Sequence, residues 1–439
     1  MAESDTQRAH EAEALGESCP QRLLTGIVGA MCIAIGAILI ALSRSHMTPS
    51  HAGPMRYVGL LILAFVTMAF CEGAFFRVHR FQFDFSQRRP LGQQAHRDVV
   101  RRLTALLATL GITWALYWVF AEYGLRFTWA LQPHFDESWY SPFFRFFAPV
   151  TVVLPVAAVP YFYLCEMFGK WTREDDELLK LGRGYLALVR LRSPEHDFYP
   201  ALRALGVKLF FIPVMTVFFV KNAQIAEGAL SHLVAHPWTW DTAAGLRLFD
   251  AMYEVFYLVD IGLALLGYVC CFRILDTHIR SAEPTLFGWA VALACYPPFN
   301  ARITGTYLPH DSQCQAWQGI LAAWPFLSWV VGALILAMIW VYLYATIAFG
   351  FRFSNLTHRG IIRRGPYAWV RHPAYAAKNL SWWLISLPFL TGPAACIRLL
   401  LLNTLYVARA LTEERHLSRD PVYCEYMKKV KWRFIPGVI

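Results

Sequence analysis

The chain has 439 residues, of which 57% are hydrophobic and only 16% are charged, and its formal net charge is +10. Long uninterrupted apolar runs indicate an integral membrane protein and exclude a soluble globule. The basic charge is typical of membrane topology and of attraction to anionic lipid headgroups, so it does not indicate nucleic-acid binding.

Ten apolar segments are predicted to be transmembrane helices, because one crossing takes about 20 residues. Six of them have this length or come close to it: Leu23–Leu42, Tyr57–Phe76, Leu103–Phe120, Phe147–Leu164, Ala251–Phe272 and Leu321–Phe349. Four others are near or below the length that crosses a bilayer unaided: Leu205–Val220, Leu286–Tyr296, Tyr375–Leu390 and Ala394–Leu411. Two prolines end the segment at 286–296 early, which leaves a re-entrant or tilted segment as an alternative there. The expected fold is all-α and polytopic, with about ten spans.

Basic residues alternate between the loops as the positive-inside rule requires. Seven lie between Arg77 and Arg102 and eight between Lys170 and Lys208, whereas the neighbouring loops hold one or two each. We therefore expect both termini, and the polar motifs after residue 350, on the cytoplasmic side. The chain divides into a polar tail at 1–22, expected to be disordered, a multi-span domain without an assigned role at 23–350, and a C-terminal module at 351–439.

Some ionisable residues lie within or beside the apolar segments: Glu72, Glu166, Glu254, Asp260 and Lys378. An ionised group in the hydrocarbon region costs about 3 kcal/mol on insertion scales, so each should face a partner, a cavity or the interface. The ten cysteines include no Cys-x-x-Cys pair and indicate no metal site.

The segment 276–285 joins two predicted spans and is dense in hydrogen-bonding side chains. Its Glu283-Pro284 pair is a common signal for the start of a helix. Two roles are open for this segment, namely capping of helix ends and closing a polar pocket.

The first C-terminal motif is Arg371-His372-Pro373-Ala374-Tyr375. Pro373 is suited to the first position of a helix, where its missing amide hydrogen is not needed. The free amides of that helix start, together with Arg371 and His372, would form a positive corner for a carboxylate or phosphate. The alternative is that these side chains only anchor the helix at the membrane surface.

The second motif contains Glu413 and Glu414 and follows a two-span hairpin whose turn is Thr391-Gly392-Pro393. Such a hairpin returns the chain to the same face, so the two acids are expected near Arg371 and His372. This arrangement suits a zwitterionic cofactor. Four tyrosines are available to stack on a base or surround a cation: Tyr367, Tyr375, Tyr423 and Tyr426. A salt-bridge network that holds the tail against the bundle is the alternative.

These blocks, with the ending Phe434-Ile435-Pro436-Gly437, resemble the isoprenylcysteine carboxyl methyltransferase and phospholipid methyltransferase superfamily over about residues 351–439. The resemblance implies a membrane enzyme that binds S-adenosylmethionine from the cytosol and methylates a lipophilic or lipidated acceptor. It places His372 and Tyr375 in the cofactor site, Glu413 and Glu414 on the polar groups of the cofactor, and Arg371 on a carboxylate. Arg371 and Glu414 are then the candidate catalytic residues.

Two other functions are kept as alternatives. Membrane sterol reductases that use NADPH end similarly, but Ala374 and Lys378 depart from their pattern and favour the methyltransferase. A transporter or non-catalytic scaffold would rely on Glu72, Glu254 and Asp260, yet no pair of broken, symmetry-related helices indicates an alternating-access site.

Overall fold

The computed structural model describes residues 19–43, 55–119, 141–239, 241–297, 299–300, 307, 324–390 and 392–438. Most of the expected tail at 1–22, part of the turn at 391–393 and the first residues of the segment at 321–349 lie outside these ranges.

Eight helices in the described ranges are long and apolar enough to cross a membrane. They are α2 (Cys19–Ser43), α3 (Met55–Phe70, continued by the π-helical η2, Cys71–Phe75), α5 (Gln93–Val119), α7 (Ser141–Phe168), α9 (Phe198–Ala235), α10 (Thr242–Val269), α14 (Pro325–Phe349) and α16 (Pro393–Leu417). Each overlaps one of the predicted segments, and α9 extends well beyond the predicted Leu205–Val220 at both ends. The protein is an all-α, multi-pass integral membrane protein.

The two remaining predicted spans form shorter helices. At 286–296 the chain forms α11 (Leu286–Leu293), which is eight residues long and rises about 12 Å. At 375–390 it forms α15 (Pro373–Ser386), which has 14 residues and ends in the 3-10 turn η9 (Leu387–Phe389). Both are well short of a hydrocarbon core about 30 Å thick. The described residues therefore supply eight candidate spans where ten were expected.

The other elements are short and lie mainly between the spans. They are the helices α4 (His79–Gln82), α8 (Glu177–Val189) and α17 (Pro421–Lys429), the 3-10 turns η5 (Arg173–Asp175), η6 (Arg273–Leu275), η7 (Gly350–Arg352) and η8 (Gly365–Ala368), and the strands β1 (Ser281–Ala282) and β2 (Thr357–His358). The two strands pair antiparallel, with Ser281 opposite His358.

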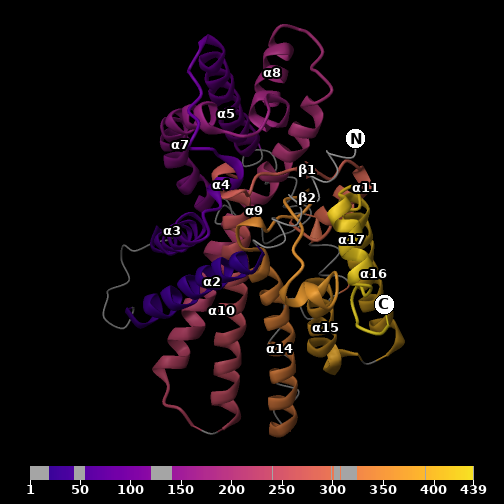
Figure 1. The fold of residues 1–439 in the computed structure, drawn as a ribbon. Coiled ribbons are helices and arrows are strands. Elements are labelled where there is room, and N and C mark those ends of the chain that lie inside the picture. The colour runs from indigo at the N-terminus through magenta and orange to yellow at the C-terminus, as the bar shows by residue number, and fades with distance from the viewer. Residues whose placement is uncertain are drawn as a thin grey trace.

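The central core is formed by α2, α3, α9, α10 and α14 (Figure 1). Ile33 of α2, Phe219 of α9 and Leu263 of α10 are almost fully buried in it. The rings of Phe211 and Tyr268 stack at 4.8 Å between α9 and α10. Helix α15 packs against α14, and α16 and α17 lie to the side of the bundle nearer β1 and β2 (Figure 1).

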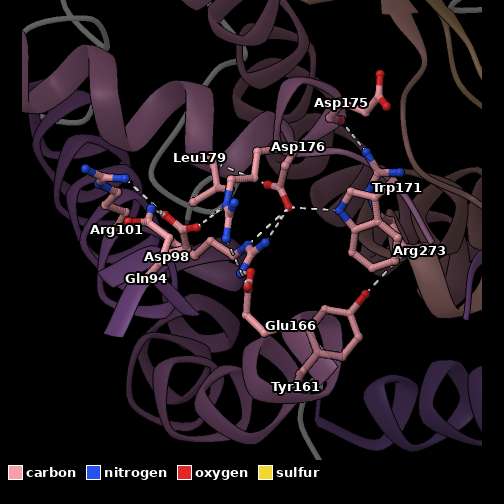
Figure 2. Close-up of polar contacts among 12 residues, drawn as sticks. Gln94, Asp98, Arg101, Tyr161, Glu166, Trp171, Asp175, Asp176, Leu179 and Arg273 are labelled. Atoms are coloured by element: carbon pink, nitrogen blue, oxygen red, sulfur yellow. Dashed lines mark hydrogen bonds and ion pairs between the residues drawn. The ribbon is translucent and has the colours of Figure 1, made fainter. Parts of the chain in front are cut away.

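A buried charge network ties α5, α7 and α8 together (Figure 2). The Arg102 guanidinium donates to Glu166 at 2.6 Å and lies 3.0 Å from Asp176, and the Arg102 side chain is only 4% exposed. Asp176 also caps α8 through the amide of Leu179 at 3.1 Å. Buried charges are tolerated when they are paired and hydrogen-bonded in this way. Glu166 is therefore paired with Arg102, one of the surroundings expected for an ionisable residue in an apolar segment.

The other ionisable residues within the spans have varied surroundings. Asp260 accepts hydrogen bonds from Tyr342, at 2.7 Å, and from Thr346. Glu72 is buried in η2. Glu254 lines a second cavity between α9, α10 and α15, away from the C-terminal motifs.

The contact between α2 and α14 depends on a glycine, and this gives a first prediction. A Cβ added at Gly26 would lie 2.9 Å from the Ile347 carbonyl carbon and closer still to its oxygen. Backbone atoms cannot move aside as a flexible side chain can, so we expect Gly26→Ala to lower the free energy of unfolding by about 2 kcal/mol. Thermal unfolding in detergent measures this effect. The control is Gly59→Ala in α3, where an added Cβ meets nothing within 4 Å and no loss is expected. Equal stability of the two variants would contradict the prediction.

Candidate functional site

A cavity lies between α14, α15 and α16, and its open space, including solvent at its mouth, is about 1300 Å³. Its walls come from the end of α14 and the following loop, from η8 and α15, and from α16 and α17. Seven of the eight sequence-predicted site residues line it: Tyr367, Arg371, His372, Tyr375, Glu413, Tyr423 and Tyr426. The eighth, Glu414, lies behind the wall.

The backbone of the first motif is held by the C-terminal tail. Helix α15 begins with Pro373 at its first turn and His372 at its N-cap position. The amide of Arg371 donates to the Trp432 carbonyl at 2.9 Å, and that of His372 donates to the Arg433 carbonyl at 2.8 Å. The tail therefore orients both side chains from outside the helix.

Glu414 lies at the centre of a cluster of positively charged or basic side chains. Its carboxylate accepts from Arg371 Nε at 2.7 Å, from Arg433 Nε at 2.9 Å, and lies 3.2 Å from His372 Nε2. The Glu414 side chain is 7% exposed. The expected proximity of the two motifs is present. Glu414 also bonds to the tail through Arg433, as the salt-bridge alternative required.

Glu413 faces the cavity. It accepts a hydrogen bond from the Tyr375 hydroxyl, and its oxygens lie 3.6 Å from Arg409 Nε and 3.8 Å from His372 Nδ1. Its side chain is 28% exposed, four times as much as that of Glu414. The imidazole of His372 lies between the two carboxylates and stacks on Tyr375 with 5.5 Å between ring centroids. Glu413 is thus the acid of the pair that a ligand in the cavity can reach.

The tyrosines form an aromatic wall. The Tyr426 hydroxyl donates to the Tyr367 carbonyl at 2.7 Å, and the rings of Tyr423 and Tyr426 lie 5.6 Å apart. Burial raises the pKa of both Tyr423 and Tyr426 well above the ordinary value for tyrosine. They therefore remain neutral phenols at physiological pH and offer ring faces rather than charge.

Several cavity residues were not singled out from the sequence. Arg409 is buried between the rings of Tyr375 and Tyr296, at 5.1 and 5.6 Å, and donates to Asn355. Its position four residues before Glu413 on α16 is a signal that helical spacing could have identified. No sequence pattern pointed to Asn355 or Tyr296, because both lie at the site only through contacts with residues far away in the sequence.

The segment 276–285 takes both of the roles left open for it. The Thr285 hydroxyl caps α11 by accepting from the Gly288 amide at 3.1 Å. Glu283 lines the cavity and is held by Arg415 of α16 at 2.9 Å. Asp276 pairs with Arg352, another cavity residue. Residues from before position 350 thus complete one wall of the site.

A comparison with protein families bears on this arrangement. Residues 326–419 match the model of the isoprenylcysteine carboxyl methyltransferase (ICMT) family. The ICMT match covers about a fifth of the chain. It includes α14, which lies before the module expected at 351–439, and it ends at Arg419, before α17. No curated protein and no solved structure matches the chain. The ICMT match supports a membrane methyltransferase.

Proposed function

We propose that residues 326–438 form an S-adenosylmethionine-dependent methyltransferase site for a lipophilic or lipid-anchored acceptor resembling an isoprenylcysteine carboxylate. The observation that carries the proposal is the cavity within the ICMT-matched region, where arginines, carboxylates and aromatic faces converge. The density of basic residues in the loops favours a cytoplasmic position for its mouth.

The residues present fit the cofactor. Its amino-acid part carries a carboxylate and an ammonium, and the cavity offers Arg409 and Glu413 side by side. Arg409 Nε lies 3.6 Å from Glu413, so the two opposite charges form one ion pair at the cavity wall. The faces of Tyr375, Tyr423 and Tyr426 suit a base or a cation.

In the proposed reaction the protein mainly aligns the cofactor with the acceptor. When bound, the cofactor supplies an electrophilic methyl group on a sulfonium. Transfer to an anionic acceptor needs little acid–base help, so holding the reactants in line and excluding water can supply much of the rate. In this proposal Arg371 helps to hold a carboxylate, while Glu414 acts indirectly by positioning Arg371 and His372.

The test is calorimetric binding of S-adenosylmethionine and, separately, NADPH to the detergent-purified full chain. We expect micromolar affinity for S-adenosylmethionine, none for NADPH, and a loss of at least about 100-fold with His372→Ala, whose ring contacts both carboxylates and Tyr375. Binding of NADPH instead would favour the reductase. Binding of neither compound would favour the scaffold or transporter.

A further inference from the structure

A serine, a histidine and a glutamate lie in sequence beside the cavity, and the proposed methyl transfer uses none of them. Ser281 lies in β1, Glu283 lies two residues farther along the chain, and His416 lies in the last turn of α16. The Ser281 hydroxyl is 2.9 Å from His416 Nε2, which is hydrogen-bonding distance. The other imidazole nitrogen, Nδ1, lies 4.0 Å from a carboxylate oxygen of Glu283. The imidazole therefore stands between a hydroxyl and a carboxylate.

The Glu283 carboxylate is held so that one of its oxygens faces the imidazole. Its Oε1 atom accepts from the Thr285 amide at 3.0 Å and from Arg415 at 2.9 Å. Its Oε2 atom faces His416, and the Glu283 side chain is only 3% exposed. The 4.0 Å separation is longer than a hydrogen bond, but catalytic hydrogen bonds are often long without substrate and tighten when it binds. A carboxylate on this side favours a proton on Nδ1, which makes Nε2 the acceptor for the serine hydroxyl.

Ser281 is the exposed member of the three, and its backbone is fixed. Strand β1 pairs with β2, and the Glu283 amide extends the pairing by donating to the Leu356 carbonyl at 2.8 Å. Ser281 is exposed, whereas His416 is 5% exposed. A reachable hydroxyl, bonded to a base that a third group orients, is the arrangement that activates a serine as a nucleophile.

We propose that Ser281, His416 and Glu283 form a second catalytic site, which hydrolyses carboxylic esters. Ser281 is its nucleophile, His416 its general base, and Glu283 orients the imidazole. His416 lines the methyltransferase cavity and Ser281 lies on the other side of its ring, so an ester at Ser281 lies outside that cavity. The proposal does not depend on the proposed methyltransferase function.

The reaction balances with water as the only co-reactant. The Ser281 oxygen bonds to the ester carbonyl carbon while its proton passes to His416 Nε2. The imidazolium gives that proton to the departing alcohol oxygen as the C–O bond breaks. Water then attacks the acyl-serine, loses a proton to His416 and releases the acid, and the proton returns to the serine oxygen. Glu283 keeps its negative charge throughout and stabilises the imidazolium.

The experiment treats the full chain in detergent with a fluorophosphonate, which phosphonylates activated serines, and locates the modified residue by peptide mass spectrometry. We expect labelling of Ser281, and turnover of 4-nitrophenyl butyrate in a parallel assay. Ser281→Ala and His416→Gln should each lower the labelling and the turnover by about 100-fold or more. The matched control is Ser86→Ala, which should change neither, because the exposed Ser86 hydroxyl bonds directly to the Asp84 carboxylate at 2.6 Å instead of to an imidazole.

Two outcomes would overturn the proposal. One is a wild-type protein that is not labelled at Ser281, the result expected of a purely structural hydrogen bond, and it requires no mutant. The other is turnover that persists unchanged in Ser281→Ala. That variant should bind S-adenosylmethionine with unchanged affinity. A failure of the wild type to bind S-adenosylmethionine would overturn the proposed function instead and would leave the esterase result standing.

Discussion

Replacing Glu414 by glutamine is expected to weaken binding of S-adenosylmethionine by about 100-fold or more. The carboxylate is 7% exposed and bonds to both Arg371 and Arg433. A neutral amide would leave the buried guanidinium of Arg371 without its anion, and breaking a buried pair in this way typically lowers the free energy of unfolding by about 3–5 kcal/mol. We expect about 3 kcal/mol of this loss to appear in cofactor binding, because the proposed site needs Arg371 and His372 in place, and 1.4 kcal/mol corresponds to a tenfold change in affinity.

Calorimetry with thermal unfolding in parallel checks this expectation. Glu414→Asp retains the charge and should recover part of the affinity, which a role in packing alone would not produce. The matched control is Glu425→Gln on neighbouring α17, where the side chain is exposed and no change in affinity is expected. Unchanged affinity and unchanged stability in Glu414→Gln would contradict the role of Glu414 as the residue that positions Arg371 and His372.

The second large effect is expected from Asp276→Asn. This substitution removes the negative charge that pairs with Arg352 of the cavity wall. The Asp276 side chain is fully buried, pairs with Arg352 and accepts from Gln82 at 3.0 Å. Its backbone is left-handed, with φ at 49°, and asparagine tolerates that conformation well. The substitution therefore tests the charge and not the turn. We expect a loss of about 3 kcal/mol in the free energy of unfolding, because Arg352 would remain buried without its anion.

Thermal unfolding of Asp276→Asn measures this loss, and cofactor affinity should fall with it because Arg352 lines the cavity. A comparable pair at the surface provides the control. Arg183 and Asp197 lie 2.9 Å apart with both side chains about one third exposed, so Asp197→Asn should cost less than about 1 kcal/mol. Similar losses of stability in the two variants would contradict the prediction that the buried Asp276–Arg352 pair costs more to break than an exposed pair.

Much of the fold could be predicted because apolar length is a local property. A run such as Leu23–Leu42 must satisfy its backbone hydrogen bonds internally in lipid, which requires a helix whatever surrounds it. The two segments that did not form long helices, 286–296 and 375–390, were short runs, and prolines lie next to the first and inside the second. Length and proline alone did not decide the outcome, because the equally short segment 205–220 contains Pro213 and forms the 38-residue α9. The proximity of Arg371 to Glu414 was also predictable, since a hairpin of two apolar segments returns the chain to its starting side.

The sequence by itself determined that this is a polytopic membrane protein and that its cationic and acidic C-terminal motifs meet. Only the tertiary structure decided that Glu413 faces the cavity while Glu414 is buried, although the two residues are adjacent. It also decided that Glu283, Asn355 and Tyr342 belong to the same cavity. The physical reason is that the burial and pairing of a side chain depend on which distant segments pack together. Contacts between residues far apart in the sequence produce no periodic pattern in either segment.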